Sequence, residues 1–175
     1  MSEDLRYPIG KFSPKKSLTD VERQTCIDDL AGLPNSLTLA VDGLTDVQLD
    51  TPYRDGGWTV RQVVHHLADS HANAYVRMKL ATTETNPLIK TYDEQAWSEQ
   101  TDALGAPVSL SLDFIDALHG RWTWWLRTLK PEDFKRRLQH PEGTAADVDG
   151  LLQLYAWHGQ HHLTHITNLA ARNKW

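Results

Sequence analysis

Four histidines lie close together near the C-terminus, in the segment LLQLYAWHGQHHLTHITNL. His158 and His162 are four residues apart, so on a helix their side chains stand one turn apart on the same face and can reach one ion. His165 falls in the same inward stripe, among leucines and an isoleucine. Because histidine is the commonest metal ligand, this spacing predicts two ligands of a metal site.

The alternative is a set of core histidines that bond to one another or to water. A lone buried histidine is more often of that kind, but a pair one turn apart among apolar residues puts the two explanations on an equal footing. Burial of an imidazole without a partner costs roughly 1 to 3 kcal/mol, whereas a metal satisfies the acceptor nitrogen and leaves the other nitrogen free to donate. A metal site would need a third ligand from elsewhere in the chain.

An earlier segment, WTVRQVVHHLADSH, supplies more histidines. At about 100° per residue, His71 lies within the apolar stripe of this segment and His66 lies at its margin. The spacing allows either residue as the third ligand and does not choose between them. Asp69, one turn after His66, could orient an imidazole or accept a proton, and His165 could support the ligands from behind. A solvated helix carboxylate and simple core packing are the competing explanations for these two.

Helix signals indicate how segments so far apart would come together. Thr19 and Glu22 match a capping box, in which two side chains satisfy free groups at a helix start. Thr59 and Gln62 repeat this pattern. Pro34 is expected to bend or split the first of these helices. Four helices are predicted, over residues 19–44, 59–85, 109–129 and 146–172.

The connections between these helices differ in character. Residues 86–108 contain two prolines and one glycine, and they predict a long crossover with a short helical piece over 94–100. Ser109 or Ser111 is expected to cap the third helix, while residues 134–143 predict an irregular or briefly extended segment. Four long helices without an alternating strand pattern predict an all-α four-helix bundle with long crossover connections.

The composition favours one globular domain over residues 1–175, because 40% of the residues are hydrophobic and 23% are charged. Acidic residues outnumber basic ones by 23 to 18, so the charge offers no reason to bind nucleic acid or an anionic membrane. Cys26 is the only cysteine and cannot form an intrachain disulfide, and the first residues lack the apolar core of a secretion signal. We therefore expect a cytoplasmic protein without a membrane span.

Several segments together resemble a known family. These are RYPIGKF, TPYRDGGWTVRQVVHHLADSH, YAWHGQHHLTHI and the triplet His140-Pro141-Glu142. They are similar to the DinB superfamily, and most closely to its YfiT-type branch of metal-dependent hydrolases, over roughly residues 6–166. The resemblance implies an antiparallel four-helix bundle with a three-histidine metal site. Carried over to this sequence, its motifs select His66, His158 and His162 as the ligands.

Three neutral imidazoles do not offset the charge of a divalent ion, and they leave one or more coordination positions open. Such open positions are typical of catalytic rather than structural sites. A bound water would then ionise near neutral pH, which favours hydrolysis of a small molecule. The same position could hold a small thiol as its thiolate. Thiol S-transfer, with which the superfamily is associated, is therefore the alternative enzyme activity. A non-catalytic metal-binding protein is the third hypothesis.

We expect one divalent metal ion per chain. Nitrogen ligands suit zinc or nickel, and iron, manganese and copper are also compatible with them. The expected partner is a small-molecule substrate, with or without a small thiol. A second apolar line on the last helix predicts a homodimer; its members are Leu152, Ala156, Leu163 and Ala170.

Overall fold

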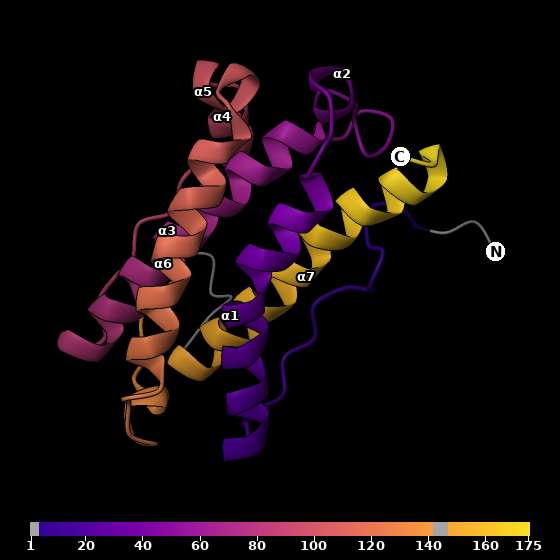
Figure 1. Cartoon of the computed structure of the whole chain (residues 1–175). Helices are drawn as coiled ribbons and strands as arrows, with labels where there is room; N and C mark the ends of the chain where they lie inside the picture. Colours follow the sequence, from indigo (N-terminus) through magenta and orange to yellow (C-terminus); the bar gives the residue numbers. More distant parts are fainter. Residues whose placement is uncertain (1–3, 142–146) are drawn as a thin grey trace.

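The computed structural model describes residues 4–141 and 147–175, and four long helices form its frame (Figure 1). The four are α1 (Asp20–Val41), α3 (Val60–Thr83), α6 (Val108–Leu126) and α7 (Val148–Asn173). Helices α1 and α3 each pack against both α6 and α7. In Figure 1, α1 and α7 run in one direction and α3 and α6 run in the other, so each helix has one parallel and one antiparallel neighbour. The predicted all-α four-helix bundle is confirmed. Its implied antiparallel arrangement is only partly correct, because α1 and α7 form one parallel pair and α3 and α6 form another.

Helix α1 begins where the sequence predicts. The Thr19 hydroxyl accepts a hydrogen bond from the backbone amide of Glu22, and the Glu22 carboxylate accepts one from the amide of Thr19. Pro34 lies inside the helix and is buried, so the helix is not split at this residue. Packing of α1 against α6 and α7 stabilises the turn that the proline weakens. The helix ends at Val41, ahead of Gly43, whose φ of 72° is left-handed.

Helix α3 also starts at its predicted capping box, whereas the predicted caps of α6 are wrong. Pro107 occupies the N-cap of α6, and both Ser109 and Ser111 lie inside the helix. Proline suits a helix start because it has no amide hydrogen to satisfy and its φ, here −57°, is already close to helical. The Ser111 hydroxyl instead contacts Nδ1 of His65 at 2.7 Å. Helix α6 ends at Leu126, short of its predicted end.

Short helices occupy the connections. Helix α2 (Asp46–Leu49), which was not predicted, lies between α1 and α3. Helix α4 (Glu94–Ser98) falls within the predicted helical piece of the crossover, and α5 (Thr101–Gly105) follows it. After α6, the 3-10 helix η1 (Asp133–Lys135) leads into isolated β-bridges, so this segment is irregular and briefly extended as predicted.

Helix α7 carries the histidine-rich segment. Its predicted first residue, Ala146, lies outside the described residues, as does Glu142 of the triplet found in the sequence. The described helix begins at Val148, where the Asp147 carboxylate accepts a hydrogen bond of 2.8 Å from the amide of Gly150. This cap satisfies one of the free amides at the helix start.

The apolar faces of the four helices meet inside the bundle, where Leu37, Leu67 and Trp122 are completely buried. The second apolar line of α7 also packs within the chain. Leu152 is buried there, and Leu163 packs against the core. Ala156 is buried as well, while Leu163 and Ala170 are half-buried, so most of this line is covered within the chain. The homodimer stays a prediction without that support. None of the helices in the described part of the chain has the length and apolar character needed to cross a membrane.

Candidate metal centre

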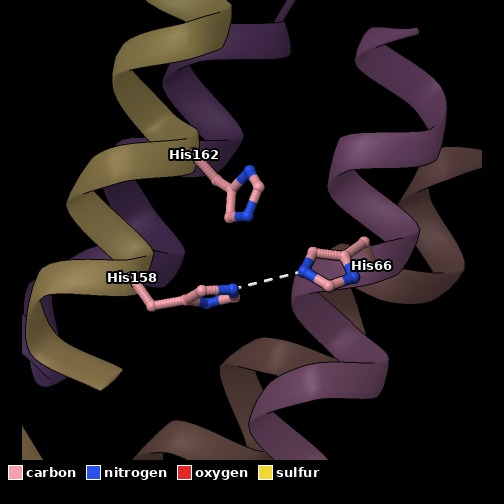
Figure 2. A group of neighbouring side chains, drawn as sticks. All are labelled: His66, His158 and His162. Carbon is pink, nitrogen blue, oxygen red and sulfur yellow. Dashed lines mark hydrogen bonds between the residues drawn. The ribbon is translucent and has the colours of Figure 1, made fainter. Parts of the chain in front are cut away.

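His66, His158 and His162 point toward one another across the contact between α3 and α7 (Figure 2). One ring nitrogen from each of the three lies within 4.8 Å of the others. The shortest approach joins Nε2 of His66 to Nε2 of His158, at 3.2 Å. The rings of His158 and His162, which stand one turn apart on α7, have their centroids 4.5 Å apart. The structure thus brings together the three histidines that the sequence motifs select.

The rotation of α3 within the bundle separates His66 from His71. His71 is completely buried, and its Nε2 lies 3.2 Å from Nδ1 of His158. The other nitrogen of His158, Nε2, is the one that faces His66. His71 therefore contacts the group from behind, and the three converging histidines include His66 instead of His71.

Burial controls the protonation of the three rings. It lowers the pKa of His66 to about 4, and it holds the pKa values of His158 and His162 well below the usual value. Neighbouring histidines lower these pKa values further, because two positive charges at this distance would repel each other. At neutral pH the three rings are neutral, and a neutral imidazole has the lone pair that binds a metal ion.

This donor set fits a divalent metal ion. It offers three neutral nitrogen donors, a combination that zinc and the later first-row transition metals accept. The facing Nε2 atoms of His66 and His158 can share only a single hydrogen between them, whereas an ion could accept a lone pair from each. Because the protein supplies three ligands, such an ion would keep a position for water or substrate.

A cavity of about 360 Å³ adjoins the three histidines. Trp58 forms part of its wall and packs against His66, with the ring centroids 4.6 Å apart. Arg54 and Glu94 bring charges of opposite sign to the same cavity. Its further lining residues include Arg6, Tyr7, Tyr53, Gln95, Trp157 and His161. Space for a small molecule beside the donors is what a catalytic centre requires and a closed structural site lacks.

The two candidate supporting residues lie in different places. His165 lines the cavity, and its Nδ1 is 3.4 Å from Nδ1 of His162. Burial lowers the pKa of His165 to about 4. Asp69 is not among the residues that line this cavity, and burial, with the negative charge of Asp102, raises the pKa of its carboxyl to about 6. The structure therefore brings His165 to the three histidines and leaves Asp69 outside.

His119 of α6, which is not among the residues predicted from the sequence, extends the contacts behind the centre. Its Nε2 lies 2.9 Å from Nδ1 of His71, and its Nδ1 lies 2.6 Å from the carbonyl oxygen of Leu30 in α1. Three imidazoles in succession thus connect the centre to α1. One signal was available, because His119 recurs at helical spacing with apolar residues on the buried face of α6. These residues are Ile115, Trp122 and Leu126.

A second group of histidines overlaps the first. His161, His162 and His165 also place one ring nitrogen each within 4.8 Å of the others. A neutral imidazole has a single lone pair, so His162 can serve only one of the two groups at a time. Nδ1 of His161 is buried without a hydrogen-bond partner among the described residues, and its ring stacks on Trp157 at a centroid distance of 4.5 Å.

The family model of the DinB superfamily matches residues 30–166 of the chain. A Bacillus subtilis (strain 168) protein named "Putative metal-dependent hydrolase YfiT" is 51% identical over 175 residues, with 99% of this chain and 98% of that protein covered. A relative with the same kind of name from Oceanobacillus iheyensis is 49% identical over 170 residues, with coverage of 97% and 98%. The solved structure of Bacillus subtilis YfiT has a TM-score of 0.95 to this chain at 51% identity, and the match covers 98% of each chain. That structure is described as a "probable metal-dependent hydrolase with an unusual four-helix bundle topology".

Proposed function

Because this chain belongs to the DinB superfamily, we propose that it is a metal-dependent hydrolase that holds one divalent ion on His66, His158 and His162. One observation carries the proposal: three neutral imidazoles from two helices converge beside a cavity of about 360 Å³. The names of the Bacillus and Oceanobacillus relatives support the same class of activity.

When bound, such an ion would lower the pKa of a coordinated water to about 7 and would polarise a substrate carbonyl. The chain contributes the conditions for this chemistry. Burial keeps the three histidines neutral at the pH where they must bind. Trp58 packs against the His66 ring at an interplanar angle of 49°, and His66 is only 5% exposed, so bulk water has little access to this ring. Arg54 and Glu94 on the cavity wall can bind polar groups of a substrate.

Zinc and nickel are the ions that we expect, since both accept three imidazoles with further ligands from water. Iron, manganese and copper are compatible with the same donors. Elemental analysis of the protein purified from its native host tests the identity of the ion and the stoichiometry of one per chain. A protein that carries no metal under these conditions and takes up none on addition of zinc or nickel would contradict the proposal.

The activity is tested with the metal-loaded protein on panels of small esters and amides, with and without a small thiol plus an electrophile. Hydrolysis predicts turnover of an ester or amide without thiol. The same open position could bind a thiolate, so turnover only in the presence of thiol would replace hydrolysis with thiol S-transfer. Stable metal binding without turnover of either kind would indicate a non-catalytic metal-binding protein.

A pair of adjacent histidines supplies a matched control. His66→Ala removes one of the three converging donors and is expected to abolish stoichiometric metal binding. His65 is the preceding residue, but its ring nitrogens contact the Ser111 hydroxyl at 2.7 Å and the carbonyl oxygen of Ala106 at 3.2 Å. His65→Gln is therefore expected to retain the metal. Equal loss of metal in both variants would show that the effect is not specific to the centre.

A further inference from the structure

We propose that His71, His119 and His165 are positioning residues, which hold His158 and His162 in the tautomer that presents the Nε2 lone pair to the metal centre. The inference rests on the proposed metal site. It concerns hydrogen positions, and two backbone carbonyl oxygens determine them, because a carbonyl can only accept a hydrogen bond.

The first chain of contacts starts at α1. The carbonyl oxygen of Leu30 lies 2.6 Å from Nδ1 of His119, so this nitrogen carries the hydrogen. A neutral imidazole has only one N–H, so Nε2 of His119 must accept, and Nδ1 of His71 donates to it at 2.9 Å. Nε2 of His71 is then the acceptor for Nδ1 of His158, at 3.2 Å. The only arrangement that satisfies every contact leaves the lone pair of His158 on Nε2.

The rings of this chain are suited to stay neutral. His71 is fully buried and His119 is 1% exposed. Burial lowers the pKa of both, and neighbouring histidines lower the pKa of His71 further. The two rings are nearly parallel, with an interplanar angle of 13°, which suits a hydrogen bond between their edges, and Trp122 packs edge-on against each. Close packing in the core therefore prevents the rings from turning over to exchange their nitrogens.

A second, shorter chain reaches His162. The carbonyl oxygen of Arg6 lies 3.3 Å from Nε2 of His165, so this nitrogen donates and Nδ1 of His165 accepts. Nδ1 of His162, 3.4 Å away, then carries the hydrogen of that ring. The lone pair of His162 is again on Nε2. Tyr53 stacks on His165 with the centroids 3.9 Å apart and holds this ring in place.

His66 differs from the other two. Its Nε2 faces Nε2 of His158 at 3.2 Å, and since the latter holds a lone pair, Nε2 of His66 carries the hydrogen in the metal-free protein. To present a lone pair at the same atom, His66 must move its hydrogen to Nδ1. The two ligands on α7 are thus ready for the ion, whereas the ligand on α3 must change tautomer.

Nitrogen NMR of the metal-free protein at neutral pH tests the hydrogen positions without any metal or substrate. His71, His119, His158 and His162 are expected as Nδ1–H tautomers, and His165 and His66 as Nε2–H tautomers. An Nε2–H tautomer at His119 or His158 would overturn the proposal. This result would leave the hydrolase assignment intact, because the assay on esters and amides does not depend on it.

Metal affinity provides the second measurement, by competition with a chelator for zinc. His71→Leu removes the acceptor that holds His158 and is expected to weaken binding by about 10- to 100-fold, the usual effect of losing a partner behind a ligand. His119→Gln can still donate to Leu30 and accept from His71, so it should restore most of the affinity that His119→Leu loses.

Trp122→Phe is the matched control for damage to the core, since Trp122 contacts the rings of His71 and His119 without forming part of the chain. It is expected to lower stability while metal affinity stays within a few-fold of wild type. A loss of affinity equal to that of His71→Leu would mean that packing alone is responsible. If the leucine variants do not fold, the tautomers of the wild-type protein decide the question.

Discussion

The metal-free protein is expected to lose stability steeply below pH 6.5. Burial lowers the pKa of His66 and that of His165 from the usual 6.5 to about 4, so both rings stay neutral in the folded state where the unfolded chain is already protonated. Stability rises with pH wherever the unfolded state binds more protons. It therefore decreases as the pH falls from about 6.5 to about 4, and it does not change from this cause above pH 7.5.

The size of the effect follows from these two pKa values. As the pH falls from 8 to 5, each of the two rings lowers the unfolding free energy by about 2 kcal/mol. Near pH 5.5 the unfolding free energy changes by about 1.2 kcal/mol per pH unit for each ring. Burial also lowers the pKa of His71, His158 and His162, which adds to the loss. Since domains of this kind have only about 5 to 15 kcal/mol in total, the metal-free chain should unfold in mildly acidic solution.

Urea denaturation at half-unit steps from pH 8 to pH 4.5 measures this directly. His66→Leu removes one titrating ring and should reduce the slope near pH 5.5 by about 1.2 kcal/mol per pH unit. An ion at the proposed site would bind only the neutral rings, so a saturating concentration of zinc should move the acid transition to lower pH. An unfolding free energy that stays constant from pH 7.5 to pH 5 in the metal-free protein would refute the reasoning.

Asp69→Asn should raise the unfolding free energy by about 1 kcal/mol at pH 8 and by little at pH 4, because a carboxyl whose pKa is raised to about 6 destabilises the fold when it is charged, and solvent screens the charge of this half-buried group. The variant should keep the metal, and no gain in stability at pH 8 would contradict the prediction. Gly159→Ala would place a Cβ 2.6 Å from Cδ2 of Leu33 and should weaken metal binding at the adjacent His158. It should also lower the unfolding free energy, because the close contact costs about 1 to 3 kcal/mol and the better helix propensity of alanine offsets only about 1 kcal/mol of this. Gly32→Ala in α1, which has open space around it, should instead stabilise the fold by up to about 1 kcal/mol. Denaturation and chelator competition compare the two variants, and equal effects would contradict the close approach of α1 and α7. Light scattering at micromolar concentration tests the homodimer, and a monomer there would reject it.

Local signals in the sequence were sufficient to place most of the bundle. The capping boxes at Thr19 and Thr59 mark real helix starts, because a cap is made by side chains only three residues apart. The start of α6 was misplaced, since serine and proline both suit a helix start. In the structure Pro107 caps α6, and the Ser111 hydroxyl contacts His65 of α3 instead.

The sequence by itself determined that His158 and His162 share one face of a helix, because four residues make about one turn whatever surrounds them. Only the tertiary structure decided that His66 faces them and that His71 and His119 stand behind. Helical periodicity specifies which side chains share one face of a helix. It does not specify which face of a neighbouring helix packs against them. That relation depends on how four helices pack, and therefore on contacts between residues far apart in the chain.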